Sequence, residues 1–425
     1  MGVIVNDGRM TANLRIDGAR LWSTLTETAQ FGAIPGPAPD RPGMCRLTLS
    51  DEDVAMRNWF THACQAIGMT VTSDKIGSMF ARLPGSDPAL PPIAIGSHLD
   101  TQPTGGRFDG ILGVLAGLEV ARTLHDAGLV TRHPIEVINW TNEEGARFAP
   151  AMVASGLFAG EFTLEYALGQ KDRDGVTMGE ALEKSGFAGD EEPGAHPLAA
   201  HFELHIEQGP VLEAEALEIG IVSGVQGIRW YDAVVKGVTC HAGTTPMALR
   251  RDALHAAARL AIAVDDIGRS DPGASLATIG LFQAYPGSRN TAPGEVRLTI
   301  DLRHPVVPGL DGMEAALRQA IAALETQLGV TITLDPIWSS PPVSFDAGVI
   351  DAIGAATRRL GYTHRPMLSG AGHDSVYTAR VAPTGMIFIP CENGLSHNVA
   401  ENITPDQAER GANVLLQAVL DYDRI

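Results

Sequence analysis

The sequence predicts an α/β fold, in which a mixed, largely parallel sheet flanked by helices is interrupted by a smaller α+β domain. Buried apolar runs alternate with amphipathic stretches in the first and last parts of the chain. A strand–helix–strand order of this kind gives right-handed crossovers and parallel strands. The middle of the chain has the order strand, helix, strand, strand, helix, strand, which is typical of a ferredoxin-like split βαβ unit. At about 100–200 residues per domain, the 425 residues suggest two or three domains, and two are expected.

The elements of the larger domain follow from apolar spacing. Residues 14–31 and 51–67 are predicted amphipathic helices, and Ser50 or Asp51 is the expected N-cap of the second. In residues 110–127 the apolar positions 111, 112, 115, 118 and 121 have helical spacing. The predicted strands are short apolar runs, namely residues 92–98, 134–141, 200–206 and 384–390.

The inserted domain is expected to span residues 221–337, so that the larger domain comprises 1–220 and 338–425. Residues 312–328 have apolar side chains at intervals of three and four, which predicts an amphipathic helix. The other predicted elements are a helix at 249–267 and strands at 227–236, 274–284, 295–303 and 330–334. The proline-rich stretch from Pro336 to Pro342 marks the predicted return to the larger domain.

Charge and composition exclude several classes of protein. The formal charge of −19 disfavours nucleic acid and anionic membrane surfaces as main partners, because both require basic patches. The sequence has no apolar run of about 18 residues and no signal-peptide pattern at its start. Its four cysteines are too few for a disulfide scaffold. We therefore expect a cytoplasmic protein without a membrane span.

Potential metal ligands recur at the predicted strand ends. His98, Asp109, Glu144, His205 and His397 each follow an apolar strand or stand beside glycine. The carboxyl ends of parallel strands meet at one edge of a sheet, where α/β folds place their sites. Imidazole and carboxylate donors suit zinc or a similar ion. The set has one carboxylate more than a mononuclear site needs, so a shared carboxylate could bridge two ions.

Two further acids stand beside these ligands. Asp100 lies two residues after His98, on the same face of an extended segment, and can orient the imidazole ring as a supporting carboxylate. Glu143 precedes Glu144, and it can take a proton from water while its neighbour binds metal.

These residues lie in a series of motifs that resembles a known family. The chain resembles the dinuclear zinc amidohydrolases related to aminoacylases and co-catalytic metallopeptidases, and within them the hydantoinase/carbamoylase branch. That branch includes N-carbamoyl-L-amino-acid hydrolases, allantoate amidohydrolases and β-ureidopropionases. The motifs, in chain order, are SHLDTQPTGGRFDGILGV, NWTNEEGARFAPAM, FELHIEQGPVLE, HAGTTPM, SRN, DLRH, SGAGHD and GLSHN.

The resemblance implies a zinc-peptidase-like catalytic domain with two divalent metal ions. His98, Asp109 and His205 would bind one ion, and the bridging Asp109 with Glu144 and His397 would bind the other. Zinc is expected, and manganese, cobalt or nickel could replace it. Asp100 would orient His98, and Glu143 would act as general base and acid.

The resemblance also implies substrate contacts and a homodimer formed through the inserted lid domain. His241 would polarise the scissile carbonyl from the partner subunit, and Asn290 would hold the substrate. Arg303 would take the α-carboxylate, since an arginine fork pairs with a carboxylate in two-pronged fashion. Gln208 and the loop from Gly370 to His373 would complete the pocket.

The expected activity is hydrolysis of N-carbamoyl-L-amino acids to the L-amino acid, carbon dioxide and ammonia. Allantoate is the nearest alternative substrate, followed by β-ureidopropionate and N-acyl amino acids. A catalytically inactive binding or scaffold relative is the alternative from a different class. Its mark would be the loss of a ligand or of the base, and all of these positions are intact here.

Overall fold

A computed structural model describes residues 4–5 and 11–424 of the chain. The chain divides into two compact units. The first comprises the chain up to Gly224 together with the chain from Ser344 onward, and the second is Val225–Val343. That the second unit works as a lid or dimerisation domain stays a prediction. Each unit is built around its own core of buried apolar side chains.

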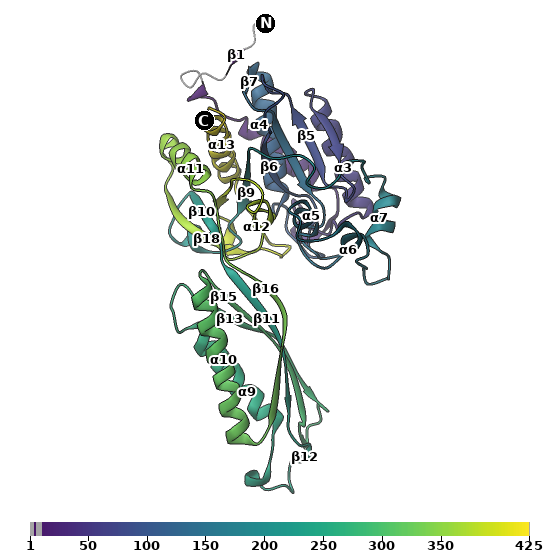
Figure 1. The fold of residues 1–425 in the computed structure, drawn as a ribbon, viewed down its shortest axis with the longest axis vertical. Helices are drawn as coiled ribbons and strands as arrows, with labels where there is room; N and C mark the ends of the chain where they lie inside the picture. Colours follow the sequence, from purple (N-terminus) through teal and green to yellow (C-terminus); the bar gives the residue numbers. More distant parts are fainter. Residues whose placement is uncertain (1–3, 6–10, 425) are drawn as a thin grey trace. The chain divides into compact units, whose positions relative to one another are not determined.

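The first unit is built on a mixed sheet that has, within the described residues, nine strands. The central strands β19-β9-β6-β8 run parallel, and antiparallel strands extend the sheet on either side (Figure 1). This arrangement confirms the predicted fold class. The strands are β4 (Thr70–Ser73), β5 (Met79–Leu83), β6 (Ile93–His98), β8 (Ile135–Trp140), β9 (Ala200–Ile206), β10 (Ile219–Val225), β17 (Val343–Ser344), β18 (His364–Ser369) and β19 (Thr384–Ile389).

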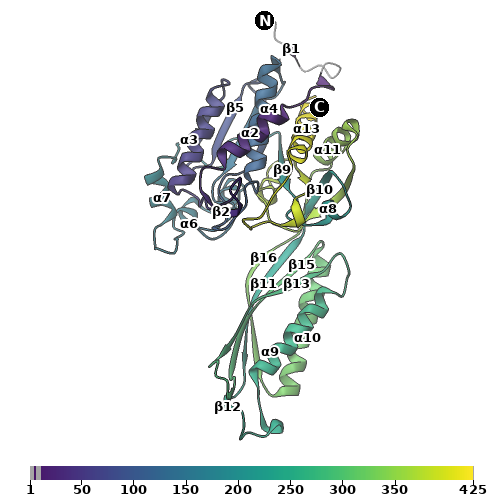
Figure 2. The ribbon, with the colours of Figure 1, turned by 180° about the vertical axis from the view of Figure 1, so that it is seen from behind.

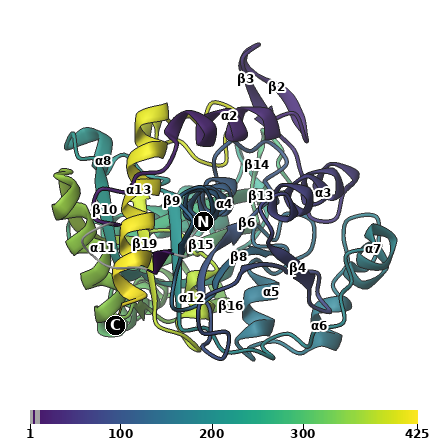
Figure 3. The ribbon, with the colours of Figure 1, turned by 90° about the horizontal axis from the view of Figure 1, so that it is seen from above.

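Long helices pack together against the sheet (Figure 3). They are α2 (Gly18–Thr28), α3 (Asp51–Gln65), α4 (Ile111–Asp126), α11 (Ala347–Leu360) and α13 (Pro405–Tyr422). Helix α4 is buried on nearly all sides, and it lies close to the strands because two of its residues are glycines. A Cβ on Gly113 would come within 2.6 Å of the Leu204 carbonyl oxygen, and one on Gly117 within 2.9 Å of Ile95. This close approach fixes the start of α4 beside the ends of β6 and β9.

Shorter elements complete the first unit. They are β1 (Ile4–Val5), β2 (Ala33–Ala38), β3 (Arg41–Met44), β7 (Leu129–Val130), α5 (Val153–Phe158), α6 (Leu164–Leu168), α7 (Met178–Ser185), α8 (Val211–Ala214), α12 (Ser375–Thr378) and the 3₁₀ turn η2 (Glu392–Gly394). An aromatic cluster of Phe80, Trp140 and Phe158 packs α5 near β5 and β8. Among the helices that the structure describes, none combines the length and the apolar character that crossing a membrane requires.

The second unit has the predicted ferredoxin-like order. Its four-stranded sheet runs β13-β15-β11-β16 with every neighbouring pair antiparallel, and two helices pack side by side against it (Figure 2). Leu298, Ile300 and Leu302 alternate along β15 and are buried with the apolar face of these helices. The elements are β11 (Gly227–Lys236), β12 (Cys240–His241), η1 (Met247–Leu249), α9 (Ala253–Gly268), β13 (Leu276–Tyr285), β14 (Thr291–Ala292), β15 (Glu295–His304), α10 (Val307–Leu328) and β16 (Thr331–Ser340).

Some boundaries differ from those predicted. Helix α2 is shorter than 14–31 and begins after Asp17, whose carboxylate caps it by accepting from the backbone N–H of Arg20. Helix α10 begins earlier than 312, because Pro308 fits the first turn of a helix. Strand β16 continues through Pro336 beyond the predicted 330–334. It is an edge strand with an irregular register here, so the missing N–H of proline is tolerated.

A buried ion pair joins α3 to the strand-end loops. The Arg57 Nε donates to Asp53 Oδ2 at 2.7 Å, and both side chains are almost completely buried. The same carboxylate oxygen accepts from the backbone N–H of Leu49, and Arg57 also donates to the carbonyl of Gly77. The pair thus connects three segments that surround the strand ends.

Removing one member of this pair should destabilise the first unit strongly. We expect Asp53→Ala to lower the free energy of unfolding by about 3–5 kcal/mol, because Arg57 is left buried without its counterion. Urea unfolding followed by circular dichroism measures the change. Asp265→Ala removes an exposed partner of Arg269 at the same sequence spacing and should leave stability nearly unchanged. Equal effects of the two variants would contradict this account.

Candidate functional site

The ends of parallel strands bring the candidate ligands together in the first unit. Strand β6 ends at His98, which lies in register with Trp140 at the end of β8. His205 is the penultimate residue of β9. Because these strands are parallel neighbours, their carboxyl ends form one edge of the sheet, as the sequence predicted.

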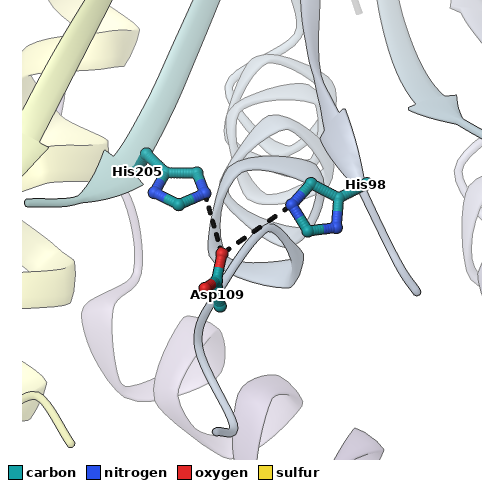
Figure 4. Close-up of side chains that lie close together, drawn as sticks. All are labelled: His98, Asp109 and His205. Carbon is teal, nitrogen blue, oxygen red and sulfur yellow. Dashed lines mark ion pairs between the residues drawn. The ribbon is translucent and has the colours of Figure 1, made fainter. Parts of the chain in front are cut away.

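One group of donors comprises His98, Asp109 and His205 (Figure 4). The Nε2 atoms of His98 and His205 lie 3.8 Å and 3.1 Å from Asp109 Oδ1. All three side chains are buried. Gly110, which follows Asp109, has a φ of +69°, and a Cβ there would lie 2.3 Å from the His98 ring. The turn that presents Asp109 therefore requires glycine both for its backbone conformation and for space.

A second group shares Asp109 and adds Glu144 and His397. The His397 Nε2 lies 3.6 Å from Asp109 Oδ2 and 3.3 Å from Glu144 Oε2. The two oxygens of Asp109 thus serve different groups of donors, which is the arrangement that a bridging carboxylate requires. His397 is about half exposed, so this side of the cluster is open to solvent.

The charges of the cluster fit a cationic occupant. Burial raises the pKa of Glu144 well above its usual range, and the nearby Asp109 carboxylate adds to the effect. Burial alone would also raise the pKa of Asp109, but hydrogen bonding and charge from His205 outweigh it and lower that pKa. Imidazole nitrogens and carboxylate oxygens in two adjoining groups are the donor set that divalent metal ions accept. The residues present therefore fit metal ions.

A third group of potential donors comprises Glu203, His205 and His373, which are all buried. Glu203 already accepts hydrogen bonds from the hydroxyls of Ser97 and Ser375. The His373 Nε2 lies 2.9 Å from the Ser369 hydroxyl, and its ring packs 4.6 Å from that of His205. Glu203 is thus held by two hydroxyls, and His373 packs against the ring of His205.

Asp100 contacts both the candidate ligand His98 and the turn that carries Glu143. Its backbone carbonyl lies 2.9 Å from His98 Nδ1, whereas its carboxylate is 3.8 Å away. The backbone carbonyl is therefore the nearer partner of the ring, and orientation of His98 by the Asp100 carboxylate stays a prediction. The carboxylate instead accepts from the backbone N–H groups of Glu143 and Glu144, each at 3.3 Å. Asp100 therefore positions the turn that carries Glu143 and Glu144.

Glu143 lies within this cluster. Its Oε2 is 3.4 Å from His98 Nε2, and the residue is buried. Burial and then the charges of Asp374 and Glu144 raise its pKa well above the usual range. A carboxylate beside potential metal ligands can accept a proton from water, and a raised pKa makes it a stronger base for that step.

Gln208 lies beside Asp109, at the edge of the donor cluster. Its Nε2 donates to Asp109 Oδ2 at 2.9 Å, and the Ser396 hydroxyl donates to the same oxygen at 2.7 Å. The expected substrate residue thus contacts the expected bridging carboxylate. Gly370 lies between Ser369 and His373, in the loop that holds the His373 ring.

The other predicted substrate residues belong to the second unit. His241 on β12 pairs with Thr291 on β14, and the Ala242 N–H donates to the Asn290 carbonyl at 2.9 Å. His241 Nδ1 accepts from the backbone N–H groups of Gly243 and Thr244, so the proton of a neutral imidazole lies on Nε2. The structure therefore brings His241 and Asn290 together.

Arg303 lies at the other end of this unit. It pairs in register with Ile228 near the start of β11, whereas β12 follows the end of β11 at Lys236. The strand between Ile228 and Lys236 spans roughly 25 Å at about 3.3 Å per residue. Arg303 and His241 of one chain thus lie beside opposite ends of β11.

Glu401 is a site residue that the sequence interpretation missed. Its Oε1 accepts from the backbone N–H groups of Phe108 and Asp109, both at 3.0 Å, and the side chain is buried. Burial and the neighbouring Asp109 raise its pKa to about 8. In the sequence it is only an acid four residues after the predicted ligand His397, and this spacing does not show its contact with the Asp109 backbone. Glu401 fixes the backbone from which Asp109 projects.

Comparisons with known proteins match residues of both units. The profile of peptidase family M20/M25/M40 matches residues 94–421. An N-carbamoyl-L-amino-acid amidohydrolase of Rhizobium meliloti is 47% identical, covering 97% of this chain and 98% of its own. A ureidoglycolate hydrolase of Arabidopsis thaliana is 32% identical, and the match covers 96% of this chain and 87% of the relative. A hydantoinase/carbamoylase family amidase from Burkholderia multivorans is 51% identical in sequence, and its crystal structure matches with a TM-score of 0.92. The match covers 96% of this chain and 98% of the amidase. The resemblance expected from the motifs is confirmed.

The contact of Glu401 with the Asp109 backbone predicts an effect on metal affinity. We expect Glu401→Ala to weaken divalent-metal binding by about 10–100-fold, because the loop that presents Asp109 loses its acceptor. Titration calorimetry with zinc measures the affinity. Glu401→Gln keeps an acceptor oxygen and should recover part of the loss. Glu392→Ala is the control, because Glu392 lies in the same region but pairs with Arg41, and the zinc affinity of this variant should equal that of the wild type. Wild-type affinity in Glu401→Ala would contradict this role.

Proposed function

Because the chain belongs to the peptidase family M20/M25/M40, we propose that this hydrolase removes the carbamoyl group of N-carbamoyl-L-amino acids. The products would be the L-amino acid, carbon dioxide and ammonia. The observation that carries the proposal is the pair of donor groups that share Asp109, with Glu143 beside them. Relatives of this name, together with the hydantoinase/carbamoylase amidases, support the substrate class.

We assign two divalent ions to the cluster. His98, Asp109 and His205 would hold one, and Asp109, Glu144 and His397 would hold the other. The mixed nitrogen and oxygen donors suit zinc, and manganese, cobalt or nickel would also be accepted. When bound, such ions act as Lewis acids toward the scissile carbonyl and the attacking water.

Glu143 serves as general base and then as general acid. Its carboxylate takes a proton from the attacking water and later delivers it to the nitrogen that leaves the carbonyl carbon. Asp100 holds the backbone of this residue and so fixes where its carboxylate lies. The raised pKa of Glu143 makes its carboxylate a stronger base and so favours uptake of the proton from water.

The second unit supplies the remaining contacts. His241 would donate from Nε2 to the carbonyl oxygen as negative charge develops there, an effect worth about 3–4 kcal/mol for single donors in other enzymes. Arg303 would bind the α-carboxylate through its guanidinium fork. Asn290, Gln208, Gly370 and His373 complete the proposed set of substrate contacts.

Two copies of the chain are needed for this assignment. Arg303 lies beside the start of β11 and His241 follows the end of that strand, so roughly 25 Å of strand lies between them. One small substrate cannot bind both residues of the same chain. We therefore propose a homodimer, formed through the second unit, in which His241 comes from the partner subunit. A cytoplasmic location stays a prediction.

Ammonia release from a small panel of substrates tests the activity. The zinc- or manganese-loaded protein should hydrolyse N-carbamoyl-L-methionine, while the D-enantiomer, which places its carboxylate differently, should be inert. β-Ureidopropionate, allantoate and ureidoglycolate test the ureido acids, and release of free amine tests N-acetyl-L-methionine. Ureidoglycolate is included because of the Arabidopsis thaliana relative. Activity confined to allantoate or ureidoglycolate would reject the carbamoyl amino acids as substrates.

Substitution of Glu143 separates proton transfer from metal binding. We expect Glu143→Gln to lower kcat at least about 100-fold, because the amide cannot accept the proton of the attacking water. Its metal content, measured by elemental analysis, should equal that of the wild type. Glu183→Gln changes an exposed glutamate on α7 and serves as the control. Near-normal turnover by Glu143→Gln would exclude the general-base role.

A further inference from the structure

Arg303 is held by a carboxylate of its own strand. Its Nε lies 3.0 Å from Asp301 Oδ1, and its Nη2 lies 2.8 Å from Asp301 Oδ2. The two residues are two positions apart on β15 and therefore share a face of the sheet. That face is opposite the one on which Ile300 and Leu302 are buried. The result is a two-pronged pairing of the guanidinium with Asp301.

Asp301 is in turn fixed by the neighbouring strand. Trp230 on β11 lies directly opposite Asp301 in the strand register, and its Nε1 donates to Asp301 Oδ2 at 2.9 Å. The Trp230 ring packs 4.9 Å from that of Trp338 on β16. Three adjacent strands thus supply a continuous series of contacts that ends at Arg303.

The pairing sets the plane of the guanidinium. Asp301 contacts its Nε and Nη2 atoms. A substrate carboxylate would bind the guanidinium in the plane that this pairing sets. Since the plane of the guanidinium is already set, little side-chain freedom is lost when such a carboxylate binds.

We propose that Asp301 is a positioning residue that sets the plane of Arg303 for the substrate carboxylate, and that Trp230 holds Asp301 in place. This inference rests on the proposed function, in which Arg303 binds the α-carboxylate. It extends the site to two residues that do not themselves touch the substrate. If Asp301 instead competed with the substrate for Arg303, its neutralisation would lower KM; positioning requires that KM rise.

Steady-state kinetics with N-carbamoyl-L-methionine test the inference in the metal-loaded full-length protein. We expect Asp301→Asn to raise KM about tenfold and to leave kcat within about twofold, because orientation of the carboxylate anchor is lost. Trp230→Phe keeps an aromatic ring but lacks the Nε1 donor, and it should raise KM about threefold. Glu295→Gln is the matched control, since Glu295 pairs with Arg297 at the same spacing on the same strand. Its KM should stay at the wild-type value.

A double-mutant cycle shows whether Asp301 acts through Arg303. Arg303→Lys should itself raise KM, and in that background Asp301→Asn should add less than about twofold. A merely structural role would lower the melting temperature and leave the two effects additive. An unchanged or lowered KM in a folded Asp301→Asn variant overturns the inference alone. Absence of turnover by the wild-type protein overturns the proposed function and the inference with it.

Discussion

The buried carboxylate of Asp109 is the group on which the first unit's site depends. Its two oxygens face different donor groups, and its backbone is fixed by Gly110 and Glu401. Like charges from Glu143 and Glu144 make a buried cluster of this kind unfavourable unless cations balance it. The close packing of α4 and the buried network of α3 hold these groups together. The rigid sheet edge therefore maintains an arrangement that the side chains would not adopt by themselves.

The sequence was sufficient to predict the features that follow from apolar periodicity and from sequence motifs. Apolar periodicity predicted the parallel core and the split βαβ unit, and motif residues predicted ligands such as His98 and His397. It could not show Glu401, because its role depends on a loop that returns to the Asp109 backbone. Nor could it show that Asp100 contacts His98 through its carbonyl, since spacing does not distinguish backbone from side chain. The prediction that the inserted domain's last strand ends before Pro336 was wrong, because an edge strand such as β16 can contain a proline.

Both units position polar groups by local bonds to the backbone or to adjacent strands. In the second unit, two backbone N–H groups fix the His241 tautomer, and Asp301 fixes the Arg303 plane. In the first, Asp100 and Glu401 hold the turns that carry the acids. Preorganised groups lose little freedom when a substrate binds, so more of the binding energy is retained.

The separation of His241 and Arg303 within the second unit has a genetic consequence. In the proposed dimer, each reaction centre takes one of these residues from each copy of the chain. A chain without His241 and a chain without Arg303 would each be inactive when expressed alone. Mixed together, they would form heterodimers in which both lesions fall in one centre and the other centre is intact. Two loss-of-function alleles of this gene would therefore complement one another.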